Sequence, residues 1–169
     1  MRDGRKIPLS LLSSGQQELL PLLAMLPDRQ IYRYKQLLYI EEPEAHLFPS
    51  AQSKLVELLA NLLSGSRDKI NLVITTNSPY VLSKFNNLVL AASLSRSRSK
   101  EQVARVVPPE NWLGRGRLCA YAICEGKLCN ITDPDGLINA IYLDDISGAI
   151  AEEFDHLLEL EIDSSAKSK

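Results

Sequence analysis

The 169-residue sequence has no long apolar segment, few cysteines and no strong excess of charge of either sign. Its apolar stretches are far shorter than the about 20 residues that a membrane-spanning helix needs, and no signal-type apolar core follows the polar N-terminus. A formal net charge of -2 argues against a protein that binds nucleic acid through a strongly basic surface. We therefore expect a cytoplasmic protein without a membrane partner, folded as a single domain over residues 1–169.

The cysteines are few and their spacing is uninformative for metal or redox chemistry. Cys119, Cys124 and Cys129 are five residues apart, and the two histidines, His46 and His156, are distant in sequence. This spacing fits neither a C-x-x-C zinc site nor a redox pair. An odd number of cysteines without a secretory leader indicates a reducing compartment, and we expect the three side chains to be small buried or half-buried hydrophobes.

Apolar patterning in the first half of the chain predicts an α/β fold. The runs Gln36–Ile40 and Ile70–Thr76 have the composition of parallel strands, the first of them buried on both faces. A helix capped by Ser50 and ending at Gly65 would connect them in a βαβ unit. Ser14-Gly15-Gln16-Gln17 has the spacing of a capping box with Ser14 as N-cap, and predicts a helix that reaches Pro27 with a kink at Pro21.

The second half predicts a smaller, antiparallel section. A third strand is expected at residues 88–91, a loop at 93–100 and a C-terminal helix from Ser147 to Leu160. Antiparallel strands are expected at 103–107, 118–124 and 127–132, with Glu125-Gly126 as a hairpin turn. The chain would then consist of a motif-bearing α/β core at residues 7–92, followed by antiparallel strands and a helix at residues 101–162.

Two adjacent carboxylates, Glu41 and Glu42, follow the first strand directly before Pro43. Open α/β sheets bind ligands at the carboxyl ends of their strands. In a nucleotide hydrolase one such acid holds Mg²⁺ while its neighbour polarises the attacking water. A solvated turn between strand and helix is the alternative explanation for the pair.

Two further polar segments have compatible chemistry. Residues 12–16, Leu-Ser-Ser-Gly-Gln, combine hydroxyls, a glycine and the free N–H groups of a helix start, which together can hold a phosphate. Residues 75–79, Thr-Thr-Asn-Ser-Pro, place polar side chains at the same sheet edge as the two acids. Each segment taken alone is more simply explained as a helix cap.

In this order and spacing, the segments resemble the heads of ABC-type ATPases. Leu12–Gln16 resembles the L-S-G-G-Q signature, Leu37–Pro43 a Walker B strand, Glu44–Leu47 the D-loop and Leu72–Leu82 the switch strand. The detailed sequence is more similar to RecF/SMC/OLD-like AAA family ATPases than to transporter subunits. The resemblance covers about residues 7–90. It implies a partial P-loop NTPase (ABC-type) fold, mainly a parallel sheet flanked by helices, with a small antiparallel C-terminal section.

The resemblance also implies roles and ligands. ATP and Mg²⁺ would be the cofactors, with Glu41 on the Mg²⁺ side and Glu42 as the general base or water-orienting residue. Complete heads of this kind dimerise around two ATP molecules. The γ-phosphate on the opposite subunit would be contacted by Ser13, Ser14, Gly15 and Gln16, and Ala45 and His46 would cross the dimer interface.

The sequence departs from the family pattern at two points. The switch position, usually histidine, is Asn77, which can donate a hydrogen bond but cannot carry a proton, so we predict slower hydrolysis. No G-x-x-x-x-G-K-[ST] pattern occurs; neither Gly65 nor Gly114-Arg115-Gly116 is followed by the required lysine. We therefore expect weak or no ATP binding by the chain alone. Its partner would be an N-terminal ATPase lobe or a complete ATPase head, whether the chain is a truncated piece, a split gene product or a remnant.

Other functions remain open at this point. The chain could be a non-catalytic dimerisation or regulatory remnant that engages a complete head. A metal-dependent nuclease is less well supported, because Asp133-Pro134-Asp135 is more simply a turn. Arg96, Arg98 and Lys100 either contact DNA in the full assembly or lie in a solvated loop. Trp112, with Arg115 and Arg117 nearby, is either an interaction patch or a core anchor.

Overall fold

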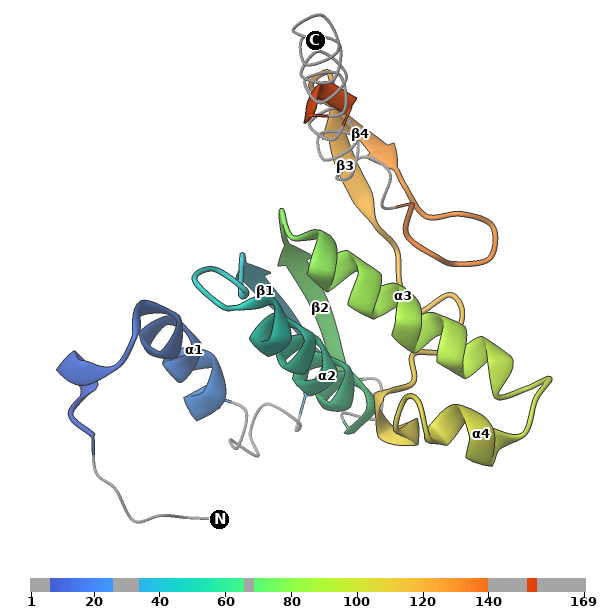
Figure 1. The fold of residues 1–169 in the computed structure, drawn as a ribbon, viewed down its shortest axis with the longest axis horizontal. Coiled ribbons are helices and arrows are strands. Elements are labelled where there is room, and N and C mark those ends of the chain that lie inside the picture. Colours follow the sequence, from blue (N-terminus) through green and yellow to red (C-terminus); the bar gives the residue numbers. More distant parts are fainter. Residues whose placement is uncertain (1–6, 26–33, 66–68, 140–151, 155–169) are drawn as a thin grey trace, which may run out of the picture.

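The computed structural model describes residues 7–25, 34–65, 69–139 and 152–154 (Figure 1). The described part is an α/β fold with one parallel pair of strands and a separate antiparallel pair. In chain order the elements are η1 (Leu9–Leu11), α1 (Ser14–Met25), β1 (Gln36–Glu41), α2 (Pro49–Gly65), β2 (Ile70–Thr75), α3 (Pro79–Leu94), α4 (Lys100–Ala104), η2 (Pro109–Asn111), β3 (Tyr121–Cys124) and β4 (Lys127–Asn130).

The predicted βαβ unit is confirmed. β1 and β2 pair in parallel, from Gln36 opposite Ile70 to Glu41 opposite Thr75, and α2 connects them. Both strands agree with their predicted bounds to within one residue. The predicted cap at Ser50 is wrong, because the helix already begins at Pro49. Proline suits a first helical position, where its fixed φ is helical and no N–H partner is lost.

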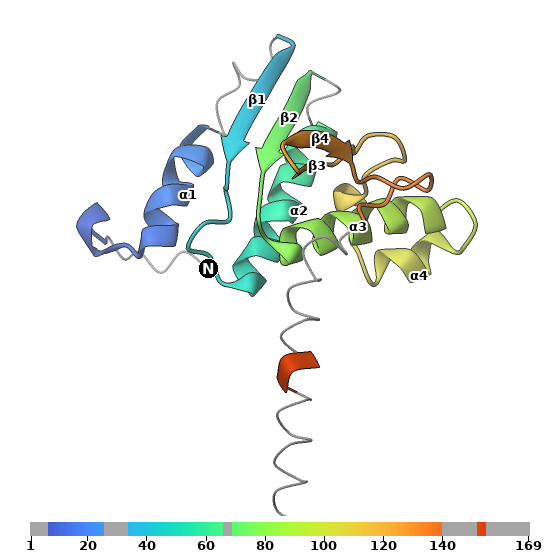
Figure 2. The same cartoon turned by 90° about the horizontal axis from the view of Figure 1, so that it is seen from above.

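The hydrophobic core lies on one face of this sheet. Helix α2 packs on that face, α3 packs against α2 and runs away from the end of β2, and α1 lies beside β1 (Figure 2). Leu88 and Val56 are fully buried between the two helices, and Ile74 of β2 packs against them. Leu22 of α1 extends the core by packing against Leu59 of α2.

The opposite face of the sheet is open in the described part of the chain. Leu37 is 65% exposed, Tyr39 58% and Val73 40%. Side chains alternate between the faces of a strand, so these three share the face that α2 and α3 do not cover. The prediction that the first strand is buried on both faces is therefore wrong for the described residues.

The start of α1 is a capping box displaced by one residue from the predicted one. The Ser13 N–H donates to Gln16 Oε1 at 3.0 Å, and the Gln16 N–H donates to Ser13 Oγ at 3.4 Å. Ser13 is thus the N-cap, and Ser14 is the first helical residue. The Gln17 side chain instead donates to the Leu12 carbonyl at 2.8 Å. Pro21 lies inside the helix as expected, whereas the predicted end at Pro27 falls outside the described residues.

Two predicted strands in the second half are wrong. Residues 88–91 belong to α3, and residues 103–107 contain the end of α4 and the turn after it. In α3 the buried positions Val81, Phe85, Leu88, Val89 and Ala92 recur at helical spacing, so the apolar run at 88–91 continues a helical stripe. The loop predicted at 93–100 is shorter than expected, because α3 extends to Leu94 and α4 begins at Lys100.

The predicted hairpin is confirmed in a shorter form. β3 and β4 pair antiparallel, and Glu125 and Gly126 form the turn with φ of 50° and 75°, as a tight two-residue hairpin requires. Cys124 and Cys129 are half-buried, but Cys119 is exposed, so the prediction for that residue is wrong.

Trp112 is a core anchor. Its ring packs against the main core, and its Nε1 donates to the Val107 carbonyl at 2.8 Å. Residues 152–154 are helical, and the rest of the predicted helix from Ser147 to Leu160 lies outside the described residues. None of the helices in the described ranges is both long and apolar enough to cross a membrane.

Candidate functional site

Two turns meet at the carboxyl end of the parallel sheet. One follows β1 at residues 42–47, and the other follows β2 at residues 76–78. The parallel register places Glu41 opposite Thr75. The Glu42 N–H then donates to both the carbonyl and the hydroxyl of Thr75, at 3.0 and 3.2 Å. Sheet pairing therefore continues into the first turn and holds the two turns together.

Glu42 and Asn77 are directly hydrogen-bonded across this edge. The Asn77 Nδ2 donates to Glu42 Oε1 at 2.9 Å, and both residues are exposed. An amide donor orients a carboxylate without neutralising it. The Asn77 amide thus orients an exposed carboxylate at the edge of the sheet.

The backbone of the first turn is unusual. Glu42 has a φ of 38° and His46 a φ of 58°. Side chains other than glycine are disfavoured in this left-handed region, and such conformations gather at functional sites. A turn with two of them within five residues is held by its contacts rather than by local preference.

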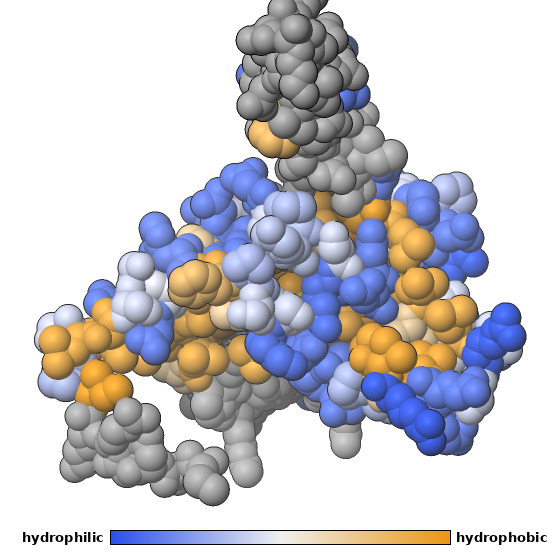
Figure 3. Space-filling model, in the orientation of Figure 1, coloured by the Kyte–Doolittle hydropathy of each residue, from blue (hydrophilic) through white to orange (hydrophobic). Residues whose placement is uncertain are grey.

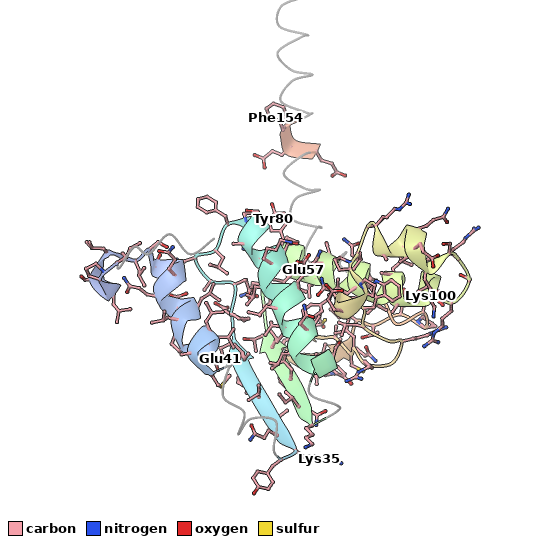
Figure 4. All side chains as sticks on the ribbon, turned by 90° about the horizontal axis from the view of Figure 1, so that it is seen from below. Lys35, Glu41, Glu57, Tyr80, Lys100 and Phe154 are labelled. Atoms are coloured by element: carbon pink, nitrogen blue, oxygen red, sulfur yellow. The ribbon has the colours of Figure 1, made fainter. Side chains whose placement is uncertain are left out.

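Glu41 lies on the open face of the sheet, beside a groove of about 580 Å³. The groove runs between α1 and the ends of the strands, and Figure 4 shows Glu41 near α1. Glu18 and Glu42 also line it. In the described part of the chain no group of three or more His, Cys, Asp or Glu side chains is arranged to hold a metal ion.

This arrangement is compatible with a nucleotide-bound Mg²⁺. Such an ion takes one or two protein ligands, and phosphate oxygens and water supply the rest. Glu41 could provide one carboxylate ligand from the end of β1. A dedicated cage of several acids is not needed.

Close packing joins the segment at residues 12–16 to the first turn. A Cβ on Gly15 would lie 2.7 Å from the His46 carbonyl oxygen and 2.8 Å from the Leu47 side chain, so only glycine fits there. His46 Nε2 also lies 3.5 Å from Glu18 Oε1, in an exposed pair that adds little stability. The start of α1 therefore packs closely against the turn that contains Ala45 and His46.

The structure thus brings the predicted residues into two adjoining groups. Glu41, Glu42 and Asn77 lie at the sheet edge, and residues 13–16 lie against residues 45–46. Ser13, Ser14 and Gln16 are exposed, with Ser13 and Gln16 also used in the capping box. The two groups are joined by the turn at 42–47.

Three residues near this edge were given no individual role in the sequence analysis. Glu44 is buried to 6% exposure and accepts a hydrogen bond from the Thr76 hydroxyl. Phe48 is 82% exposed and Tyr80 54%, at the starts of α2 and α3. The third acid in Glu41–Glu44 was a signal for Glu44. An aromatic side chain next to a helix-opening proline, at Pro49 and again at Pro79, was a signal for the other two.

The acids that could have indicated a nuclease are used in a turn. Asp133 Oδ1 accepts the Leu137 N–H at 2.8 Å, and Asp135 Oδ1 lies 3.2 Å from Arg115 Nη2. Both carboxylates thus have local structural partners. No convergence on a metal follows from the D-x-D spacing.

Family comparison agrees with an AAA-type, P-loop ATPase-like class for the motif-bearing half. A family model described as "AAA domain, putative AbiEii toxin, Type IV TA system" matches residues 1–83, just under half of the chain. Those residues end within α3 and include both turns of the site. Comparisons with curated proteins and with solved structures gave no match.

Proposed function

We propose that this chain supplies the hydrolytic half of a composite, ABC-type ATP site. In this scheme Glu42 is the general base or water-orienting residue, and Asn77 holds its carboxylate. Glu41 provides the carboxylate on the Mg²⁺ side, and residues 13–16 present a signature segment to ATP on a second head. The match to an AAA-type domain over residues 1–83 supports the class.

The observation that carries the proposal is the Asn77–Glu42 hydrogen bond of 2.9 Å at the carboxyl end of the parallel strands. Ligands of open α/β sheets bind at that edge. Bound ATP and Mg²⁺ would supply the reactive phosphate and its charge neutralisation. This chain would orient the attacking water and accept its proton at Glu42.

The open face of the sheet and the exposed residues of α1 support a partner. Figure 3 shows hydrophobic residues gathered over η1 and α1, where Ile7, Leu9, Leu11, Leu20 and Leu23 are exposed. We propose that an N-terminal ATPase lobe, or a complete head, supplies the phosphate loop and covers part of this surface. The completed head would form a homo-oligomer, with Ala45 and His46 at the interface, and DNA would contact the full assembly.

The test is ATP hydrolysis by a completed head, in which a lobe carrying a phosphate loop is joined ahead of residue 1 or supplied in trans. Glu42→Gln should lower the turnover number by about 100-fold or more, because general base catalysis contributes 10²–10⁴-fold, while ATP binding remains. Glu57→Gln is the matched control, since that acid lies on α2 in an ion pair with Lys84. Equal turnover in the wild type and Glu42→Gln would refute the proposal.

The chain alone should bind ATP weakly or not at all. Micromolar binding in a nucleotide titration would overturn the claim that the phosphate loop comes from elsewhere. In the completed head, Asn77→His should raise the turnover number, because histidine can carry the proton that an amide cannot. Unchanged turnover would remove Asn77 as the cause of slow hydrolysis.

A non-catalytic docking module is the second candidate, supported by the exposed apolar residues on α1. It predicts binding to a complete head without any effect of Glu42→Gln. The same set of variants therefore decides between the two functions.

A further inference from the structure

Glu44 differs from the two acids that precede it. Glu41 and Glu42 are exposed, whereas only 6% of the Glu44 surface is accessible. Its side chain points from the first turn towards the second turn, and its Oε1 accepts a hydrogen bond from the Thr76 hydroxyl. A buried carboxylate thus links the turns beneath the exposed Glu42–Asn77 pair.

The Thr76 hydroxyl connects Glu44 to the rest of the second turn through a further hydrogen bond. A hydroxyl has one proton, so donating it to Glu44 leaves the Thr76 oxygen free to accept the Ser78 N–H at 3.0 Å. The Ser78 hydroxyl in turn accepts the Val81 N–H at 3.3 Å and donates to Gln52 of α2. Both neighbours of Asn77 are therefore fixed, while the Asn77 side chain itself is exposed.

A role in holding the two turns together does not by itself explain why residue 44 is a glutamate. Its second oxygen, Oε2, is buried and has no hydrogen-bond partner among the described residues. A buried acceptor without a donor is destabilising. An apolar residue could fill the same space without this cost. The hydrogen bond that Glu44 does make is with Thr76, the residue directly before Asn77.

We propose that Glu44 is a positioning residue for the hydrolytic pair. It fixes Thr76 and Ser78 so that the Asn77 amide remains on Glu42. The positional claim stands on these contacts, and its meaning for catalysis rests on the proposed ATPase function.

The positional claim is tested on the chain itself by the side-chain amide signals of Asn77 in ¹⁵N–¹H correlation spectra. Asn77→Ala identifies these signals, and Glu42→Ala gives their position when the hydrogen bond is lost. Glu44→Ala should move them to that same position. Glu44→Gln keeps a carbonyl acceptor for Thr76 and should leave them near the wild-type position. Glu57→Gln, with its acid on α2, should leave them unchanged.

A second pair of variants keeps the test decisive if Glu44→Ala does not fold. Thr76→Val removes the hydroxyl at nearly constant volume and should release the Asn77 amide, whereas Thr76→Ser should retain it. Wild-type Asn77 signals in folded Glu44→Ala, or in folded Thr76→Val, overturn the proposal.

In the completed head, Thr76→Val should lower kcat by about 10- to 100-fold, the range expected from misplacing a reacting group, with KM for ATP unchanged. Thr76→Ser should restore kcat. If the variants release the Asn77 signals but even the wild-type head hydrolyses no ATP, the ATPase function is refuted and the positioning role stands. Unreleased signals in an active head would refute the positioning role alone.

Discussion

Both faces of the β1–β2 sheet carry apolar side chains, but the surroundings of these side chains differ between the faces. Leu38, Ile40, Leu72 and Ile74 pack on the side of α2 and α3. Leu37, Tyr39 and Val73 on the other side are 40–65% exposed. The difference shows that the described residues complete one layer of helices over the sheet, and that apolar composition of a strand does not reveal which of its faces the same chain covers.

The open face is also the face of Glu41 at the end of β1. A partner that covers Leu37 and Tyr39 would therefore also approach the acid proposed for the Mg²⁺ side. Burial of the open face and completion of the ATP site would then be a single event. The following predictions test this contrast, beginning with the largest effect.

Shortening a side chain on the covered face should be costly. Ile70 is 2% exposed and packs with Leu62, so Ile70→Ala should lower the free energy of unfolding by about 2–5 kcal/mol through lost burial and a cavity. Leu37→Ala, on the other face, should change it by about 0.5 kcal/mol or less. Urea unfolding measures both, and equal losses would contradict the contrast.

The contact between α1 and the first turn should tolerate no added methyl group. Gly15→Ala should destabilise the chain by about 1–3 kcal/mol, because the new Cβ overpacks against the backbone of His46. At Gly114 the nearest atom to an added Cβ is 3.7 Å away, so Gly114→Ala is a control without a clash. A Gly15→Ala protein as stable as Gly114→Ala would show that α1 is not seated on the turn.

An ion pair supports the helices of the covered face. Glu57 lies 2.7 Å from Lys84 of α3 and 2.8 Å from the exposed Lys54. Partial burial alone would raise the pKa of Glu57, but hydrogen bonds and charge from the two lysines outweigh it and hold the pKa below its ordinary value. Glu57→Gln should lower the free energy of unfolding by about 1 kcal/mol at neutral pH.

The pH dependence follows from the lowered pKa. A carboxyl with a lowered pKa in the folded state stabilises above its unfolded pKa, and this contribution is lost as pH falls through the folded value. The stability difference between wild type and Glu57→Gln should therefore be full above the ordinary pKa of a glutamate side chain and shrink as the pH falls below it. A difference that grows on acidification would contradict the assignment.

The smallest effect is expected for Tyr39→Thr on the open face. Threonine keeps a high β-propensity, so the free energy of unfolding should change by about 0.5 kcal/mol or less. Fluorescence of a hydrophobic dye bound to the chain should fall, because less apolar surface remains exposed. Unchanged dye fluorescence would mean that this face is not accessible in solution.

Sequence patterns predicted the elements whose signals were unambiguous. The apolar runs of β1 and β2, the helical stripe of α2 and the Glu125-Gly126 turn were all identified. Residues 88–91 were assigned to a strand because a short apolar run fits either a strand or a buried helix. The N-cap of α1 was predicted one residue too late, because Ser13 and Ser14 are adjacent and either serine can serve as N-cap.

The site was predictable in part. The spacing of acids and polar residues after two strands pointed to Glu41, Glu42 and Asn77, since parallel strands bring their ends to one edge. The burial of Glu44 could not be predicted, because it depends on Thr76 lying opposite the turn. Nor does a single sequence reveal that Gly15 packs against the backbone of His46.

The most direct test of the central claim compares ATP turnover by the wild type and Glu42→Gln in a head completed with a phosphate loop. The proposal predicts ATP binding by both and a turnover about 100-fold or more lower for Glu42→Gln, as expected for loss of a general base. Equal turnover with bound ATP would contradict the claim that this chain carries the hydrolytic half of the site.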